Sequence, residues 1–372
     1  MKTLVISSSP LIVKDNSYYA YSPYAKELEI WAKYSTEIHF ACPVWIDDKG
    51  LLISKINFKI NKVVTLKEFN LKNSIGFINT LRYSFFNFFK IYKSIQTAQH
   101  LHIRAPGNLA LYAIIVQIFF PKKIKTVKYA GNWDLKSKQP ISYKIQKFIL
   151  NSTFLSKNCK VLVYGEWKNS SKNIIPFFTA SYKESEKTKS ELRKFSTPIK
   201  FIFVGTLSAG KRPNYAIELV KKLNEKGIVA TLELFGNGIE KEYLETFVVT
   251  NKLEKFIFFK GNQAQEIVKK AYQESHFLLL PSKSEGWPKA VAEAMFWGCL
   301  PIATNVSCIS YMLDNNNRGI ILDLVLQNDI DKILSLLKVQ ELYLLKANNA
   351  MIWSRIYTIE YFESEIKKLI QL

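Results

Sequence analysis

The sequence has little cysteine, little histidine and a shortage of acidic residues. Its 372 residues include 4 cysteines and 4 histidines. The cysteines have no paired C-x-x-C spacing and lie in apolar or loop surroundings, so we expect neither a zinc site nor a disulfide framework; they are Cys42, Cys159, Cys299 and Cys308. Reduced thiols favour a cytoplasmic protein.

Long hydrophobic runs are also lacking. The longest, at 109–120, is shorter than the roughly 18 residues that a membrane-spanning helix needs. The first residues, 1–6, read as a strand and are too short for the apolar core of a signal peptide. Because 372 residues exceed the size at which one core usually stops growing, we expect two domains.

The shortage of acid is concentrated in the first half of the chain. Residues 1–180 carry 26 Lys and Arg against 9 Asp and Glu, a net charge of +17, whereas residues 181–372 carry 26 against 22, or +4. An anionic partner or a gain in solubility would each account for this excess. We find no helix-turn-helix, RNA-binding or zinc-finger signature, so we expect no nucleic acid.

A phenylalanine-rich stretch at 70–96 offers a different anionic partner. Large apolar residues, among them Phe85, Phe86 and Phe89, alternate with lysine and arginine, as in a helix that lies on a membrane surface. An ordinary amphipathic helix with lysine on its wet side remains the alternative. The first interpretation predicts reversible attachment to the inner face of the cytoplasmic membrane.

Strands and helices alternate in both halves of the chain. The first half predicts strands at 4–7, 37–41, 100–104 and 125–129, and the second half predicts strands at 201–204, 232–235, 256–259, 277–280, 302–303 and 320–322. The polar segment near 181–197 reads as a linker. We therefore expect an α/β protein with two doubly wound, Rossmann-like domains, at 1–180 and 198–355, followed by a terminal helix at 356–372.

The chemistry is concentrated in a strand, turn and helix at 276–298. The apolar run 276–280 predicts a buried strand, Pro288 suits the start of a helix, and Gly298 suits the position just past its end. The helix N-terminus would favour an anionic group such as a diphosphate. Glu285 precedes this helix, and Glu293 lies in an apolar part of it, where it needs a hydrogen-bonding partner. A capping acid and a surface glutamate are the plainer interpretation.

A second candidate site is the glycine-bounded turn at 205–212. Lys211 and Arg212 precede a helix that Pro213 opens, and a cation beside unpaired backbone N–H groups can hold phosphate. Two exposed basic residues before a helix would explain the pattern equally well. The later loops at 236–238 and 261–262 contribute Gly236 and Asn262 as weaker candidates.

Two loops of the first half follow predicted strands and should lie at the same sheet edge. Arg104 follows one strand and could hold an acidic or phosphate group. Asn132 and Asp134 follow the next and could bind sugar hydroxyls. Asx turns and a helix cap are the alternative explanation for both loops.

The combination of Glu285, Gly286, Pro288 and Glu293 with the following Gly298-x-Leu300-Pro301-Ile302 resembles the E-x7-E signature of retaining GT-B glycosyltransferases of family 4. The resemblance covers 198–323 well, whereas the first half matches mainly in layout. Many relatives place a histidine near the second acceptor-side loop, where this chain has Gly131-Asn132-Trp133-Asp134. A pair of glycines usual after Pro301 is Ser307-Cys308 here.

The resemblance implies a GT-B fold and a retaining, metal-independent transfer of a sugar from a nucleoside diphosphate sugar to a glycan, plausibly a lipid-linked surface polysaccharide intermediate. It implies no cofactor besides this donor. Donor contacts would come from Gly205, Lys211, Arg212, Gly236, Asn262, Glu285, Gly286, Trp287, Pro288 and Glu293, and acceptor contacts from Arg104, Asn132 and Asp134. Glu285, Lys211 and Arg212 would act in catalysis. A GT-B-fold nucleotide-sugar epimerase and a basic nucleic-acid-binding protein are the alternatives.

Overall fold

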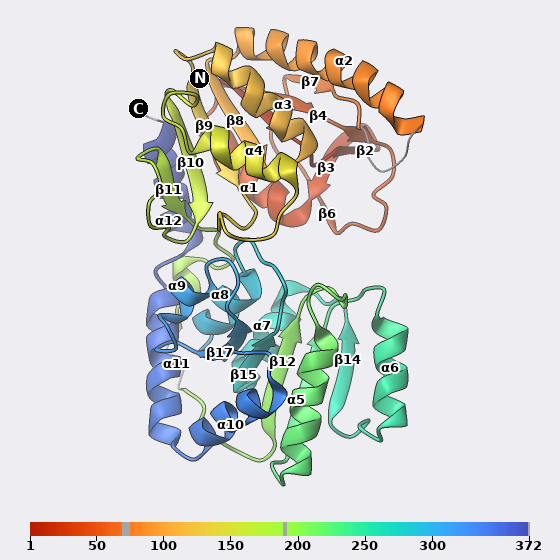
Figure 1. Cartoon of the computed structure of the whole chain (residues 1–372), viewed down its shortest axis with the longest axis vertical. Helices are drawn as coiled ribbons and strands as arrows, with labels where there is room; N and C mark the ends of the chain where they lie inside the picture. The colour runs from red at the N-terminus through yellow and green to blue at the C-terminus, as the bar shows by residue number, and fades with distance from the viewer. Residues whose placement is uncertain (69–74, 189–191, 371–372) are drawn as a thin grey trace. The chain divides into compact units, whose positions relative to one another are not determined.

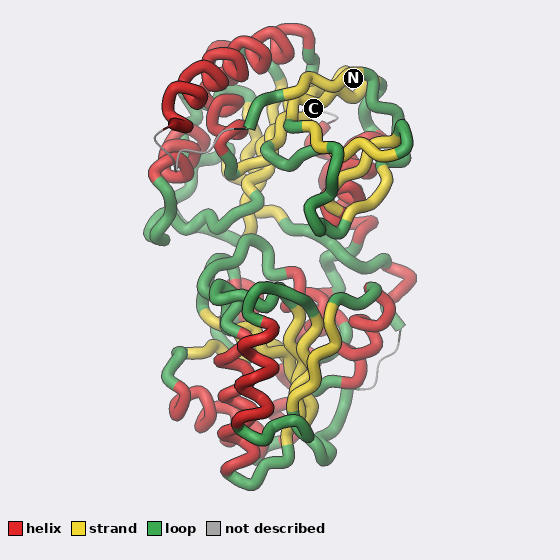
Figure 2. The backbone as a smooth tube through the Cα atoms, turned by 90° about the vertical axis from the view of Figure 1, so that its right-hand side faces the viewer, coloured by secondary structure: helices red, strands yellow, loops and turns green. Residues whose placement is uncertain are grey.

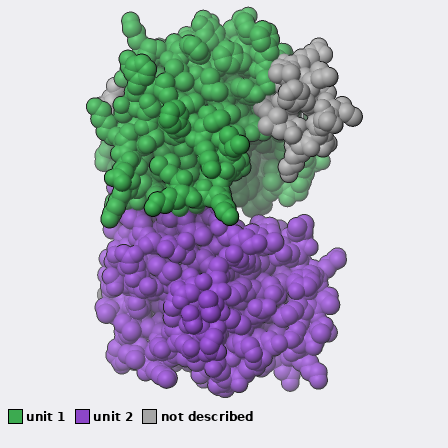
Figure 3. Space-filling view, in the orientation of Figure 1, with its two compact units in different colours: residues 1–177, 363–372 green, residues 178–362 purple. Residues whose placement is uncertain are grey.

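The computed structural model describes residues 1–68, 75–188 and 192–370, without the side chains of 75–82. The beginning of the predicted 70–96 helix therefore lies outside the described residues. The chain forms two compact units, Met1–Phe177 with Glu363–Leu372, and Phe178–Phe362 (Figure 3). The division falls just before the segment 181–197 that the sequence suggests as a linker. Within the described residues, no helix is long and apolar enough to cross a membrane.

The described residues of the first unit contain a seven-stranded parallel sheet in the order β11-β10-β9-β8-β1-β4-β7. Its strands are nearly continuous apolar runs, as expected where helices cover both faces of a sheet. They are β1 (Lys2–Ser7), β4 (Glu37–Cys42), β7 (Lys62–Thr65), β8 (His100–Ala105), β9 (Ile124–Tyr129), β10 (Cys159–Tyr164) and β11 (Ile174–Phe177).

Opposite faces of this sheet support two separate cores. Leu4 and Ile6 of β1 pack into one core together with residues of α2 and α3, whereas Val5 packs into the other with residues of α1. This is the two-residue alternation of a strand. The helices are α1 (Ser22–Lys33), α2 (Ile75–Thr97), α3 (Asn108–Val116) and α4 (Ile141–Leu150), with the short 3₁₀ helix η1 (Gln117–Phe119) after α3; α3 lies between α2 and α4 (Figure 1).

A small second sheet in the first unit and helix α4 were not predicted. The small sheet has the order β5-β2-β3-β6, formed by β2 (Leu11–Lys14), β3 (Ser17–Tyr21), β5 (Val44–Trp45) and β6 (Ile53–Lys55). Its hairpin turns at Asp15 and Asn16, whose φ angles are 48° and 53°. Positive φ at both central residues of a two-residue turn matches the twist of paired strands, and Asp and Asn tolerate it better than most residues.

The described residues of the second unit form a six-stranded parallel sheet in the order β14-β13-β12-β15-β16-β17. The strand order reverses between β12 and β15, which is the position where ligands bind in open α/β sheets. The strands are β12 (Ile199–Val204), β13 (Ala230–Phe235), β14 (Ile257–Gly261), β15 (Phe277–Leu280), β16 (Leu300–Thr304) and β17 (Ile320–Leu322).

Helices flank both sides of this second sheet (Figure 2). They are α5 (Pro213–Glu225), α6 (Lys241–Thr250), α7 (Gln265–Glu274), α8 (Lys289–Phe296), α9 (Ile309–Leu313), α10 (Leu326–Leu337) and α11 (Gln340–Ser354). The chain also has a 3₁₀ turn η2 (Glu184–Glu186) and a terminal helix α12 (Ile359–Ile370). The last part of α12 belongs to the first unit, where Glu363 accepts hydrogen bonds from Lys33 at 2.7 Å and from Tyr34 at 3.1 Å. The predicted fold class, two doubly wound α/β units, is confirmed.

The predicted linker is attached to the second unit where the structure describes it. The guanidinium of Arg193 donates to the carbonyl oxygens of Ser275 at 2.8 Å and Trp297 at 3.3 Å, and also to that of Gln273. The polar composition of 181–197 suggested a linker, but it could not reveal these hydrogen bonds to distant carbonyls.

Candidate functional site

The predicted strand, turn and helix form the centre of the candidate site in the second unit. Strand β15 ends at Leu280, and α8 begins at Lys289, one residue later than predicted, because Pro288 occupies the N-cap position. Gly298 follows the helix with a φ of 72°, a left-handed conformation that costs glycine little. The N-terminus of α8 thus lies at the carboxyl end of β15, next to the switch point of the sheet.

Glu285 and Lys211, which lie on different loops, form an ion pair. Lys211 Nζ is 2.5 Å from Glu285 Oε1, and the Glu285 side chain is only 8% exposed. The pair forms because β12 and β15 are neighbours in the sheet, so that the loops after their carboxyl ends meet. A carboxylate that is nearly excluded from water needs such a partner.

Two further contacts join the same loops. The Lys283 backbone N–H donates to Gly210 O at 2.8 Å. The Arg212 guanidinium donates to Pro281 O at 3.3 Å, and Arg212 itself has a φ of 52° at the N-cap of α5. The structure therefore brings the two predicted donor-side loops together. The side chains of both Lys211 and Arg212 extend toward the turn before α8.

Glu293 on α8 has the hydrogen-bonding partners that its apolar setting required. Ser181 Oγ donates to Glu293 Oε1 at 2.6 Å, and the Tyr272 hydroxyl donates to Oε2 at 3.4 Å. Burial, reinforced by the Glu293 carboxylate, raises the pKa of Tyr272 well above its ordinary value, so Tyr272 remains a hydrogen-bond donor. Sequence reasoning missed both partners, since neither lies in a recognisable motif.

The turn that contains Gly286 and Trp287 is held by the loop after β16. Ser307 Oγ donates to Gly286 O at 2.9 Å, and Ser307 has a φ of 53°. A positive φ is a conformation that glycine adopts readily, so the serine adopts a glycine-like backbone while its hydroxyl fixes the turn. Trp287 is buried and stacks near Trp353 at a centroid distance of 6.4 Å. Its ring therefore packs within the unit.

The glycine loops are packed against each other. A Cβ added to Gly236 would lie 1.9 Å from Gly205 O, and Gly236 has a φ of 135°. Gly236 was a weaker candidate from the sequence, and the group that approaches it is the backbone of the loop after β12. Asn262, which follows β14, is exposed.

The predicted acceptor-side arginine belongs to a buried charge cluster in the first unit. Lys128 Nζ lies 2.7 Å and Arg104 Nη1 lies 3.7 Å from Glu27 Oε2. The Arg104 guanidinium also lies 4.3 Å from the centre of the Tyr24 ring. Burial alone would raise the pKa of Glu27, but Lys128 and Arg104 outweigh it and lower that pKa. Two cations share one carboxylate, which leaves the cluster with net positive charge. Glu27 and Lys128 were not predicted as site residues.

Asn132 and Asp134 are engaged in their own loop. Asn132 Oδ1 accepts from the Asp134 N–H at 2.9 Å, and Asp134 Oδ1 accepts from the Lys136 N–H at 2.9 Å. These are the Asx turns that composition alone suggests. A role in sugar binding for these two residues stays a prediction.

Among the described residues, no group of three or more His, Cys, Asp or Glu could hold a metal ion. The chain has one D-x-D spacing near α10, at 329–331, but Asp329 is fully buried and accepts from the N–H groups of Asp323 and Leu324 at 2.8 and 3.0 Å. Asp331, two residues on, is exposed. Asp329 is thus a structural carboxylate.

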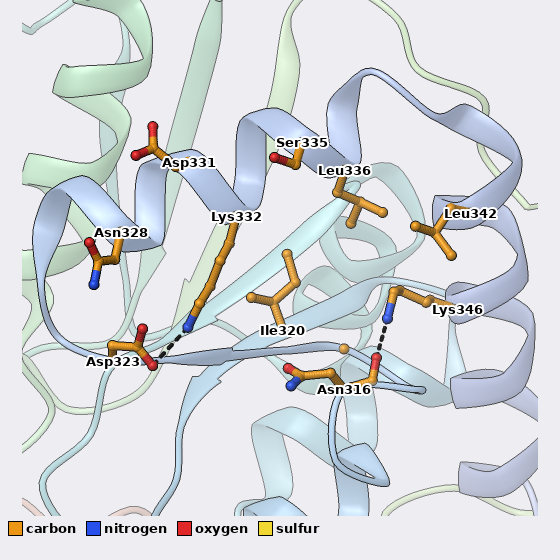
Figure 4. Close-up of a pocket in the computed structure, with 11 residues that line it drawn as sticks. Asn316, Ile320, Asp323, Asn328, Asp331, Lys332, Ser335, Leu336, Leu342 and Lys346 are labelled. Atoms are coloured by element: carbon orange, nitrogen blue, oxygen red, sulfur yellow. Dashed lines mark hydrogen bonds and ion pairs between the residues drawn. The ribbon is translucent and has the colours of Figure 1, made fainter.

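Asp331 and Lys332 line a cavity of about 660 Å³ in the second unit, beside β17, α10 and α11 (Figure 4). Two lysines of its lining are engaged within the unit: Lys332 Nζ lies 2.8 Å from Asp323 Oδ1, and Lys346 donates to Asn316 O. None of the predicted site residues lines this cavity. Lys332 also donates to Ile321 O at 2.8 Å, which ties α10 to the edge strand β17.

Comparison with known proteins relates part of this chain to a family. Residues 184–351 match the model of the glycosyl transferases group 1 family. The chain is 29% identical over 143 residues to the amylovoran biosynthesis glycosyltransferase AmsK of Erwinia amylovora, covering 37% of this chain and 35% of that protein. It is 27% identical over 187 residues to an uncharacterized glycosyltransferase of Haemophilus influenzae, covering 49% of this chain and 51% of that one. These matches span about a third to a half of the curated relatives.

Solved structures extend the likeness in fold to the whole chain. The lipopolysaccharide outer core galactosyltransferase WaaB, in its apo form, has a TM-score of 0.69 and 13% identity, covering 100% of this chain and 99% of that one. Anabaena Alr3699/HepE in complex with UDP has a TM-score of 0.66 and 13% identity, with both chains covered in full. Residues 184–351 are thus similar to the glycosyl transferases group 1 family, and the whole chain has the GT-B fold of these solved structures.

Proposed function

We propose that this protein is a glycosyltransferase that moves a sugar, with retention, from a nucleoside diphosphate sugar to a hydroxyl of a glycan acceptor. The observation that carries the proposal is the meeting of the 205–212 and 281–288 loops at the N-terminus of α8, joined by the Lys211 to Glu285 ion pair. Cations, helix N–H groups and a shielded carboxylate then lie together at the switch point of the sheet, where α/β proteins bind nucleotides.

Each donor-side residue has a distinct role in this proposal. Lys211, Arg212 and the N-terminus of α8 neutralise the departing diphosphate, which makes a metal ion unnecessary for that step. Glu293 accepts hydrogen bonds from the ribose hydroxyls, in exchange for its bonds to Ser181 and Tyr272. Glu285 binds the donor sugar, together with the backbone N–H groups of 286–287. Gly205, Gly236 and Asn262 border the nucleotide.

On the acceptor side, we assign recognition to Arg104, Asn132 and Asp134. The net positive charge of the Arg104 cluster suits an acceptor with a phosphate or acidic group. The relative named for amylovoran biosynthesis supports a surface polysaccharide intermediate as the acceptor class. A lipid-linked acceptor would account for attachment of the basic first unit to the inner face of the cytoplasmic membrane.

Helix α2 is the first candidate for that attachment. Phe85, Phe86 and Phe89 are 69%, 38% and 49% exposed, and Lys90 Nζ lies 4.1 Å from the centre of the Phe86 ring. Exposed aromatic rings beside lysine suit an anionic lipid surface, where each nearby Lys or Arg contributes about 1 kcal/mol.

The deciding experiment measures donor hydrolysis and transfer with a panel of nucleotide sugars. Release of nucleoside diphosphate from one donor, with retention at the anomeric carbon of the transferred sugar, is the expected result. Formation of an isomeric nucleotide sugar would instead indicate an epimerase. Turnover of none of the donors, together with tight binding to nucleic acid, would contradict the proposal.

A further inference from the structure

Helix α4 exposes a row of large apolar side chains, while Ile149 and Leu150 near its end are buried in the core of the first unit. Gln146 and Lys147 are 0% and 3% exposed, whereas Ile141, Ile145 and Phe148 are 76%, 42% and 72% exposed. The three exposed residues recur at spacings of four and three, so they form one stripe along the helix. A helix that folds only to cover its own sheet would turn that stripe inward.

The buried polar residues of α4 have specific partners that fix this orientation. Gln146 Nε2 donates to Gly107 O at 3.2 Å, and Lys147 Nζ donates to Asp134 O at 2.8 Å. Burial lowers the pKa of Lys147 to about 8, a measure of how little water reaches the amine. The fold therefore holds the apolar stripe outward at the cost of burying an amide and an amine.

The surface around the stripe is apolar and cationic. Phe154, just after α4, is 76% exposed, and Lys157 Nζ lies 5.3 Å from the centre of its ring. Lys144 is exposed on the helix beside the stripe. Asp134 is the sole acidic residue in the sequence between Glu68 and Glu166, and its Oδ1 already accepts from a backbone N–H.

We propose that this surface, made by Ile141, Ile145, Phe148 and Phe154 and called the α4 surface below, inserts into an anionic lipid surface. The inference rests on the membrane attachment put forward above and extends it from α2 to a second helix. Apolar side chains would enter the headgroup region while Lys144 and Lys157 pair with lipid phosphates. A protein partner would more often present side chains of both charges to this surface. Acidic residues are almost absent here, which instead suits a partner of uniform negative charge.

Two separate contacts would also fix the orientation of the first unit. One amphipathic helix alone can roll about its axis, whereas α2 and α4, on either side of α3, define a plane. The lipid would then meet the helix layer on one side of the sheet. The carboxyl ends of β8 and β9, which carry Arg104 and the 130–134 loop, would keep a constant direction relative to the bilayer.

Vesicle sedimentation of the full chain tests this inference. The probes are vesicles of phosphatidylcholine with and without phosphatidylglycerol. An α4 variant carries Ile141→Gln, Phe148→Gln and Phe154→Gln; an α2 variant carries Phe85→Gln and Phe89→Gln. A control variant changes three exposed apolar residues of the second unit, with Ile239→Gln, Val249→Gln and Ile352→Gln. We expect the α4 variant to bind anionic vesicles at least about tenfold more weakly than the wild type, and the control to bind normally.

Because the substituted side chains of the α4 variant are exposed to solvent, we expect its thermal unfolding to match that of the wild type. This measurement shows that the variant is folded. Loss of binding in the α2 variant with normal binding in the α4 variant would overturn this inference and leave α2 attachment standing. No binding of the wild type to anionic vesicles would overturn both, while donor turnover would still test sugar transfer. Self-association of the wild type that disappears in the α4 variant would also overturn it, by assigning the surface to a second copy of the chain.

Discussion

Removal of the Lys211 side chain separates the structural role of the 211 to 285 ion pair from its catalytic role. Lys211→Ala leaves the Glu285 carboxylate, 8% exposed, without its partner at 2.5 Å. A fully buried pair loses about 3–5 kcal/mol when one partner is removed. Because Lys211 is 29% exposed, water screens part of this loss, and we expect about 1–3 kcal/mol instead. That loss corresponds to a fall of about 2–10 °C in the Tm of the second unit.

The double variant Lys211→Ala with Glu285→Gln tests the cause. Glutamine removes the unpaired charge, so most of the lost Tm should return. Transfer should not recover, because the cation that we assign to the leaving diphosphate is still missing, and kcat/KM should stay about tenfold to a thousandfold below the wild type. Glu285→Gln alone should impair turnover more than affinity for the nucleoside diphosphate, since the proposal assigns Glu285 to the donor sugar and not to the nucleotide.

Thermal unfolding, calorimetry with UDP and donor kinetics together provide the measurements. Lys222→Ala, which breaks an exposed pair with Glu225 on α5, is the matched control and should leave both Tm and turnover unchanged. A Lys211→Ala protein with normal kcat/KM would refute the leaving-group role. If Lys211→Ala lowers stability and activity together, and adding Glu285→Gln restores both, the ion pair has a structural role only.

Four further outcomes are expected. Glu293→Ala should weaken nucleotide binding by about 1.5–3 kcal/mol in calorimetry, and unchanged affinity in a folded protein would contradict the ribose contact. Gly236→Ala should destabilise the second unit far more than Gly227→Ala in denaturant titration, because both have positive φ but a Cβ at Gly236 alone meets backbone, at 1.9 Å. Burial lowers the pKa of His100 to about 4 and of His102 to about 3, so on acidification these histidines bind protons in the unfolded chain at a higher pH than in the folded one. The free energy of unfolding should therefore fall below about pH 6.5, by up to about 1.4 kcal/mol per pH unit for each histidine. A stability that does not change with pH in this range would contradict their burial. EDTA should leave turnover unchanged, and loss that magnesium restores would show a metal requirement.

The sequence by itself determined the alternation of strands and helices and the position of the principal loops. These are local properties: a short apolar run followed by Pro281, a helix opened near Pro288 and a glycine at 298 with positive φ are each set by residues close together in the chain. Strand and helix boundaries in the second unit therefore agree with prediction to within a few residues. The small sheet of the first unit was not predicted because its strands have only two to five residues, too few to show a period.

Only the tertiary structure decided which side chains meet. Lys211 and Glu285 pair because β12 and β15, distant in sequence, are neighbours in the sheet. Ser181 reaches Glu293 across 112 positions, and no local pattern marks a serine for that purpose. The outward apolar stripe of α4 could not be predicted for the same reason. A helical pattern gives only the spacing of the apolar residues, whereas the hydrogen-bonding partners of Gln146 and Lys147 decide which face the fold buries.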